Sequence, residues 1–433
     1  MTASGITTTP MEASGGLVEP SLLASSIFIL LLTGPPKFRF RDPESSLYQE
    51  LDLSTVVNAV LWVAAGVWLL WQFREHFVGK RPPLRLTTTH KWALVVILLL
   101  ASSIPVSVAP ALSAFKVYQV CVMFGLGIIF VQRYGARICY ERTVFGYLLL
   151  CALIALFFFV SPDLVVFESE TGAFRLAGRG IAETGTVSSL AIVVLVATRK
   201  RLLSAMPALA CGLLGVLLFY SLNRSGYAVV VVFFVMLLWR RYPGKKLIGP
   251  VLLLTVGVLV INLAGMVPDF NAYRDPEGLL TLSGRIGLWS HFVTRTIEES
   301  PWLGFGFVSG TRVIGMEFNP QLGSGHSIFF EAFVGGGILA LSAFLILVLL
   351  MARDALWLFF FSRDRLAFAG AVLFMAVFLI GLIGGELDAG QIGFTFWMLV
   401  SLLPYLRKRA LLEPAVQFRV ASRPRLRPSE QST

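Results

Sequence analysis

Long apolar runs separated by short polar segments dominate this chain. An α-helix needs ~20 apolar residues to cross a membrane, and twelve runs approach that length. They lie near residues 20–34, 53–73, 92–109, 111–131, 144–160, 183–198, 203–221, 225–239, 247–265, 327–351, 366–384 and 390–406. The pattern predicts an all-α polytopic membrane protein with about twelve transmembrane helices.

The first run is the least typical of the twelve. Segment 20–34 is short, and the basic residues Lys37, Arg39 and Arg41 follow it. It is either a full span or a re-entrant or interfacial piece, which would leave eleven spans. In both cases the other loops stay on the same side of the membrane.

Two segments interrupt the apolar pattern and divide the chain. Residues 1–266 hold the first nine predicted spans, 267–326 form one large loop, and 327–406 hold the last three spans. Residues 407–433 are basic and end in Ser and Pro, a composition typical of disordered chain.

The large loop contains a helical pattern of its own. Apolar positions recur at helical spacing between the turn-like Ser283-Gly284 and Ser300-Pro301. These positions are Ile286, Trp289, Phe292, Val293, Thr296 and Ile297. They predict an amphipathic helix at the membrane surface. The glycines of residues 301–310 then predict a tight turn rather than a phosphate-binding loop, because no strand precedes them.

Composition and charge exclude an ordinary soluble enzyme and orient the predicted spans. Hydrophobic residues make up 56% of the chain and charged residues 14%, where a soluble domain has about 25% charged residues. The net charge is +11, and with both termini cytoplasmic the inner segments hold 25 of the 36 Lys and Arg residues. This bias marks cytoplasmic loops rather than a nucleic-acid surface, and it places the 267–326 loop outside.

Arginines on the predicted outer side are the first candidates for binding. Arg224 lies in a short turn between two spans, Arg285 begins the amphipathic pattern, and Arg175 and Arg179 lie in the outer loop before residue 183. Converging guanidinium groups suit a diphosphate, because the planar fork binds phosphate oxygens with two hydrogen bonds. The alternative is that each arginine reaches lipid headgroups.

His326 is the candidate catalytic residue. It lies at the predicted outer end of a span between Gly325 and Ser327, small residues that allow a close approach. A neutral imidazole can accept a proton from an attacking hydroxyl at neutral pH. The alternative is a cap on the span.

No metal or cofactor site is predicted. The sequence contains no HxxxH, HExxH or DxD motif, and its four cysteines form no CxxC pair. The acidic pairs Glu168/Glu170 and Glu386/Asp388 are expected to be solvated loop charges.

Three stretches together resemble the bacterial O-antigen ligase and polymerase superfamily. They are SLNRSG (221–226), SGRIGLW with SPWLGFGF (283–289 and 300–307), and GHSIFFEAFVGGGILAL (325–341). They resemble the family's S-R pair, its SGR-x-x-x-W and P-x-x-G-x-G-F motifs, and its H-[NS] motif before a Gly-rich helix. The chain departs from the family at Glu183-Thr184-Gly185, where many members have a Pro-Asn pair.

The resemblance implies an integral membrane glycosyltransferase of the bacterial cytoplasmic membrane, with its active site on the periplasmic side. The donor would be an undecaprenyl-diphosphate-linked glycan, bound by Arg224 and Arg285, and His326 would activate or position the acceptor hydroxyl. Transfer would be metal-independent and inverting. The acceptor would be another lipid-linked glycan in a polymerase or lipid A-core in a ligase, and Ser327 in the H-[NS] motif slightly favours the polymerase. Polysaccharide-assembly proteins would be further partners. A lipid-linked glycan transporter or flippase is the alternative function.

Overall fold

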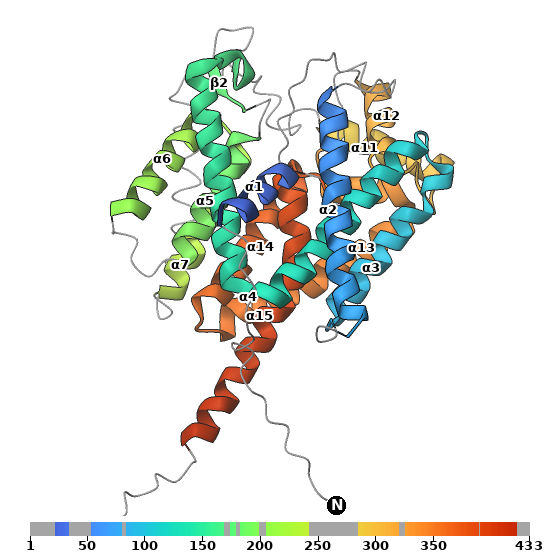
Figure 1. Cartoon of the computed structure of the whole chain (residues 1–433). Helices are drawn as coiled ribbons and strands as arrows, with labels where there is room; N and C mark the ends of the chain where they lie inside the picture. The colour runs from blue at the N-terminus through green and yellow to red at the C-terminus, as the bar shows by residue number, and fades with distance from the viewer. Residues whose placement is uncertain are drawn as a thin grey trace, which may run out of the picture.

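The computed structural model describes most of the chain and is helical almost throughout (Figure 1). The described residues are 22–33, 53–79, 84–168, 174–178, 182–198, 205–241, 285–319, 325–388 and 390–421. The predicted span at 247–265 therefore lies outside them, as does most of the first half of the large loop. Within the described chain the only sheet is the antiparallel hairpin of β1 (Val166–Glu168) and β2 (Phe174–Leu176).

The helices follow the predicted apolar runs closely. The first group is α1 (Leu22–Thr33), α2 (Leu53–Phe77), α3 (Thr88–Ser102), α4 (Pro110–Val160), α5 (Thr184–Thr198), α6 (Ala205–Ser221) and α7 (Arg224–Arg241). The second group is α11 (Arg285–Glu299), α12 (Ser309–Phe318), α13 (Ile328–Phe361), α14 (Arg365–Ile383) and α15 (Gly390–Ala421). Short 3-10 turns, η2 (Ile104–Val106) and η3 (Pro162–Leu164), follow α3 and α4.

Length and composition confirm an all-α polytopic membrane protein. Five of the described helices are long and apolar enough to cross a membrane, and three shorter helices are also apolar. Helix α5 is buried on every side, as expected for a helix that is hydrophobic all round. The number of spans stays a prediction.

Helix α4 consists of two limbs joined at Gly135. This glycine has a φ of 73° and a ψ of 171°, which are not helical values. The limbs therefore cover two of the predicted spans, and both pack against α15 in the lower centre of Figure 1. Trp397 of α15 packs so closely that a Cβ on Gly127 would lie 3.0 Å from its carbonyl oxygen.

Helix α13 is broken at Gly337, and the loop before α12 hydrogen-bonds the backbone groups that the break leaves unpaired. Gly337 has a φ of 68° and a ψ of −166°. The Val334 carbonyl accepts a hydrogen bond from Phe305 N at 2.8 Å, and Ile338 N donates to the Pro301 carbonyl at 2.8 Å. Residues 301–305 thus bond backbone groups that a continuous helix would pair internally. This is the turn expected from the glycines, but its position against α13 was not predicted.

Three further features differ from the sequence-based expectation. Helix α15 continues to Ala421, so the disordered tail predicted from Arg407 is wrong as far as that residue, and residues 422–433 lie outside the described chain. Helix α13 extends to Phe361, so the stretch between the predicted spans 327–351 and 366–384 is mostly helical and only three residues separate α13 from α14. Helix α12 occupies a stretch that was expected to be loop.

Candidate functional site

His326 lies in the turn that leads into α13. Its φ is 50°, in the left-handed region that costs a non-glycine residue of order 1–3 kcal/mol. The next residue, Ser327, caps α13: its side chain accepts a hydrogen bond from Phe329 N at 3.4 Å, and its carbonyl accepts one from Glu331 N at 3.0 Å. The half-buried imidazole is therefore displayed by a backbone that its neighbours hold in place.

Helix α11 docks against this turn through Trp289. The indole Nε1 donates a hydrogen bond to the carbonyl of Gly325 at 3.1 Å, and the ring stacks on Phe330 with centroids 5.0 Å apart. Buried apolar side chains of α11, α12 and α13 hold the three helices together: Leu288, Phe292, Ile314, Phe333 and Val334. Because Arg285 lies one turn before Trp289, the same docking brings Arg285 and His326 to one region.

The amphipathic helix predicted in the loop is confirmed, and its apolar positions face two environments. Phe292 and Thr296 are buried against the protein. Ile286, Val293 and Ile297 are exposed and form a second stripe that suits a membrane surface. The six apolar positions are therefore divided between packing inside the protein and exposure at its surface.

Glu183 acts electrostatically on Arg285 and bonds the turn before α7. Burial lowers the pKa of the Arg285 guanidinium, and the charge of Glu183 opposes this shift. The Glu183 carboxylate accepts hydrogen bonds from Asn223 Nδ2 at 2.8 Å and from Thr186 Oγ1 at 2.7 Å. A residue that departs from the family pattern thus bonds the turn that carries Arg224, and its charge also acts on Arg285.

The SLNRSG turn places Arg224 at the first position of α7. Asn223 caps the helix, since its Oδ1 accepts hydrogen bonds from Ser225 Oγ at 2.6 Å and Gly226 N at 3.1 Å. Helix α5 approaches this turn so closely that a Cβ on Gly185 would lie 2.2 Å from the Asn223 Cβ. The backbone of Arg224 is placed at this junction, while its side chain lies outside the description.

Of the other two arginines predicted to bind a diphosphate, Arg175 lies within the described chain and Arg179 does not. Arg175 on β2 donates from Nε to the carbonyl of Ser221 at 2.9 Å, at the C-terminus of α6. It therefore stabilises the same turn and reaches the negative end of a helix dipole. Arg179 lies outside the described residues.

A buried charge cluster at the same end of the bundle was missed. Lys116 of α4 pairs with Asp388 at 2.5 Å, and Asp388 is only 2% exposed. Glu331 of α13 accepts a hydrogen bond from Leu387 N at 2.6 Å, and Glu386, Asp388 and Lys116 all act on it electrostatically. The expectation that Asp388 is a solvated loop charge is therefore wrong, because its counter-ion comes from a helix far away in the sequence. A lysine on the outer side, against the charge bias, was the available signal.

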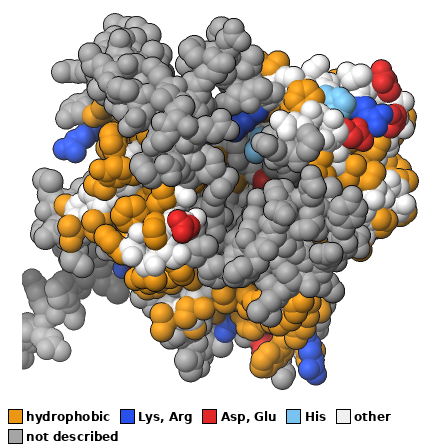
Figure 2. All heavy atoms as spheres, turned by 90° about the horizontal axis from the view of Figure 1, so that it is seen from above, with side chains coloured by type: hydrophobic (Ala, Val, Ile, Leu, Met, Phe, Trp, Pro, Cys, Tyr) orange, Lys and Arg blue, Asp and Glu red, His pale blue; other side chains and the backbone are white. Residues whose placement is uncertain are grey.

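Trp289 contacts the turn of His326, Glu183 contacts Asn223, and the charge of Glu183 acts on Arg285, all toward the upper end of the molecule. Figure 2 looks onto this end from above, and basic, histidine and acidic side chains are visible close together near the middle of the face. A guanidinium can bind an anionic leaving group, and a neutral imidazole can accept a proton. Among the described residues, no three His, Cys, Asp or Glu side chains are grouped so that they could hold a metal ion.

Comparison with known proteins agrees with the motifs. A family model described as O-antigen ligase matches residues 207–345, about a third of the chain. No curated protein matches the chain. The matched segment begins in α6, contains Arg224, Arg285 and His326, and ends in α13, while Arg175, Glu183, Lys116 and Asp388 lie outside it. Residues 207–345 are therefore similar to the O-antigen ligase family.

Proposed function

We propose that this protein transfers a glycan from a polyprenyl-diphosphate-linked donor to an acceptor hydroxyl at the outer face of the bacterial cytoplasmic membrane. The observation that carries the proposal is the hydrogen bond from Trp289 to the Gly325 carbonyl, because it joins the helix of Arg285 to the turn of His326. The undecaprenyl carrier, the inner-membrane location and the periplasmic site follow from the family resemblance and the charge bias.

Arg285 and Arg224 bind the diphosphate of the donor. Each lies at the first position of a helix, where backbone N–H groups and the helix dipole also favour an anion. As the sugar C1–O bond to phosphate breaks, negative charge grows on the leaving diphosphate, and fixed guanidinium groups stabilise it. A metal ion is not needed for this stabilisation.

His326 takes the proton from the acceptor hydroxyl. The acceptor oxygen forms a bond to C1 from the face opposite the diphosphate, so the anomeric configuration inverts in one displacement. The proton passes to the imidazole, and the polyprenyl diphosphate leaves with the bonding electrons. The restrained left-handed backbone at His326 fixes the direction from which the base approaches.

The acceptor is a second lipid-linked glycan in a polymerase or lipid A-core in a ligase. Polymerase activity is the slightly preferred reading of Ser327. That preference rests on the motif alone. Ser327 caps α13, and an asparagine would cap the helix equally well, so the cap itself does not distinguish a polymerase from a ligase.

The proposal is tested by reconstituting the purified protein with a labelled polyprenyl-diphosphate glycan and an acceptor. His326→Ala should lower turnover by ~10²- to 10⁴-fold, the usual contribution of general-base catalysis, with donor binding unchanged. Arg285→Lys should lose most activity, because an ammonium cannot make the two parallel hydrogen bonds of a guanidinium.

Two substitutions on α11 are matched controls. His291→Ala and Arg295→Lys change the same residue types, and both side chains interact with Glu317 instead of the site. They should leave turnover within about twofold of the wild type. Normal activity of His326→Ala, measured per unit of folded protein, would refute the base assignment.

A further inference from the structure

Glu331, on the first turn of α13, contacts the turn that carries His326. Its backbone N–H donates to the Ser327 carbonyl at 3.0 Å. A Cβ added to Gly325 would lie 3.7 Å from the Glu331 Cγ, which is an ordinary van der Waals distance. The side chain is buried. Its stem therefore packs beside the residue that precedes His326.

The carboxylate end of Glu331 bonds the segment between α14 and α15. Its Oε2 accepts a hydrogen bond from Leu387 N at 2.6 Å. The carbonyl of Leu387 is also bonded, because Trp397 Nε1 of α15 donates to it at 3.0 Å. The next residue, Asp388, pairs with Lys116 of α4. Glu331 is therefore bonded to a segment that α4 and α15 both hold.

The backbone of His326 needs such support from its surroundings. Its φ of 50° is unfavourable for a non-glycine residue, and such a conformation persists only where neighbouring contacts determine it. Trp289 of α11 holds the Gly325 carbonyl. The end of α14 lies against the start of α13, because a Cβ on Gly381 would lie 2.6 Å from Ile328 Cδ1. Glu331 adds a hydrogen bond across this second contact.

The surrounding charges indicate that Glu331 contributes a hydrogen-bond acceptor rather than a negative charge. Glu386, Asp388 and Lys116 all act on it electrostatically. Lys116 already pairs with Asp388, so an ionised Glu331 would be a second buried anion sharing one cation, which is unfavourable. A neutral group with an oxygen at the same place can accept the same hydrogen bond.

We propose that Glu331 is a positioning residue, whose hydrogen bond to Leu387 N fixes the first turn of α13 and thereby the direction of the His326 imidazole. The inference rests on the proposed role of His326 as the base. A base must lie within about 2.6–3.2 Å of the oxygen whose proton it takes, and a misplacement of about 1 Å can lower the rate ~10²-fold. Glu331 acts through His326 and not on the substrate.

Two substitutions separate the hydrogen bond from the charge. Glu331→Gln keeps an acceptor oxygen at the same reach without a charge, whereas Glu331→Asp keeps the charge on a shorter side chain that withdraws from Leu387. Both are assayed for transfer per unit of folded protein. Glu331→Gln should keep kcat within about twofold of the wild type, and Glu331→Asp should lower it ~10- to 100-fold. The KM for the donor should stay unchanged in both variants, because the arginines are not moved.

Hydrogen–deuterium exchange on the same samples provides a measurement that needs no substrate. The amides of residues 325–331 and of Leu387 should exchange faster in Glu331→Asp than in the wild type, because loss of the bond lowers the cost of opening the turn locally. Glu331→Gln should exchange at the wild-type rate. This measurement reports on the turn even if His326 is not the base.

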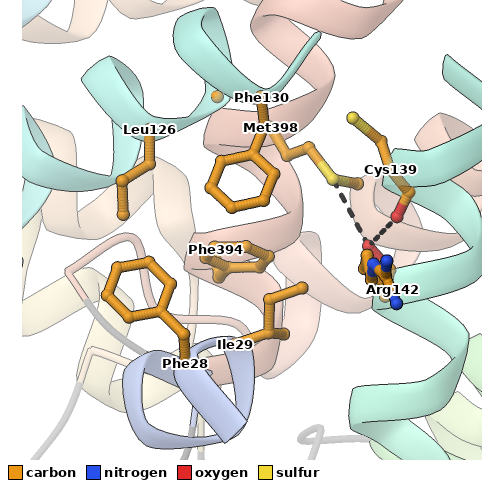
Figure 3. A pocket seen from close by; sticks show the side chains of 10 residues that line it. Phe28, Ile29, Leu126, Phe130, Cys139, Arg142, Phe394 and Met398 are labelled. Carbon is orange, nitrogen blue, oxygen red and sulfur yellow. Dashed lines mark hydrogen bonds between the residues drawn. The ribbon is translucent and has the colours of Figure 1, made fainter. Parts of the chain in front are cut away.

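Two buried residues away from the turn are controls for a general loss of stability. Thr143 of α4 lines a pocket between α1, α4 and α15, where its hydroxyl bonds the Cys139 carbonyl at 2.8 Å and the Met398 sulfur at 3.5 Å (Figure 3). Asp354, in the later part of α13, pairs with Arg407 at 2.6 Å. Thr143→Val and Asp354→Asn should lower the unfolding temperature but leave kcat and the exchange at the turn unchanged.

The outcomes distinguish this inference from the proposed function. Normal transfer by Glu331→Asp together with impaired transfer by His326→Ala would overturn the positioning role alone. Normal transfer by His326→Ala would refute the base assignment, and the exchange data would then decide whether Glu331 holds the turn. Wild-type exchange in Glu331→Asp would overturn the inference whatever the activity. So would equal losses of kcat in the two Glu331 variants, or a loss in the controls as large as that of Glu331→Asp.

Discussion

Replacing Gly337 by alanine is the most direct perturbation of the break in α13. The backbone of Gly337 has a positive φ of 68° with a ψ of −166°, a region that is essentially restricted to glycine. A Cβ at this position would also lie 2.3 Å from the carbonyl carbon and oxygen of Trp302. Both atoms belong to the backbone, so no side-chain rotation relieves the clash.

The expected loss of stability follows from these contacts. The conformation alone costs an alanine about 1–3 kcal/mol. Moving the loop away breaks the two hydrogen bonds that join Phe305 to Val334 and Ile338 to Pro301, each of which contributes about 1 kcal/mol net. Gly337→Ala should therefore lower the free energy of unfolding by about 3–5 kcal/mol.

Thermal unfolding of the purified protein, followed by tryptophan fluorescence, measures this effect. Gly215→Ala is the control, because this glycine lies in α6 and a Cβ there would meet nothing within 4 Å. Alanine should leave stability unchanged or raise it by up to ~1 kcal/mol there. If Gly337→Ala unfolded at the same temperature as Gly215→Ala, the loop would not be holding the broken helix.

Three other outcomes are expected. Asp388→Asn should lower the free energy of unfolding by about 3 kcal/mol, because it removes the charged partner of Lys116. The double variant with Lys116→Met should recover most of this loss in a thermal unfolding assay. Losses that simply add in the double variant would argue against the pair. Glu183→Gln keeps a hydrogen-bond acceptor for Asn223 but removes a negative charge that acts on Arg285. The KM for the donor should therefore fall severalfold with little change in kcat. A raised KM would contradict this electrostatic role. A chelator such as EDTA should leave the transfer rate unchanged, whereas a loss restored by added Mg²⁺ would refute metal-independent transfer.

The sequence predicted those features whose signals are local. Helix α11 has an apolar repeat within its own residues and a Ser-Pro stop directly after them, and it forms at the expected place. His326 lies at the start of a helix, where the apolar run after it predicted one, but the cap of that helix is Ser327 and not His326. The exposures along α11 were predicted less well, because they depend on packing against α12 and α13.

Features that depend on distant partners were not predictable from the pattern. The Gly-rich stretch 301–310 predicts a turn, but its partner at Gly337 is determined by tertiary packing. Asp388 belongs to a short polar segment that resembles any solvated loop, and only the fold brings Lys116 to it. Glu183 has no recognisable motif, and its contact with Asn223 depends on the close approach of α5 and α7.

The pair of Lys116 and Asp388 has a consequence for biosynthesis. About 270 residues separate the two partners, and a ribosome adding ~5–20 residues per second needs about 14–54 s to make them. During that interval the first limb of α4 is already available for insertion, while the carboxylate that neutralises its lysine has not been synthesised. The ion pair can therefore form only after the segment between α14 and α15 has been made, and until then Lys116 lies in an apolar segment without this counter-ion.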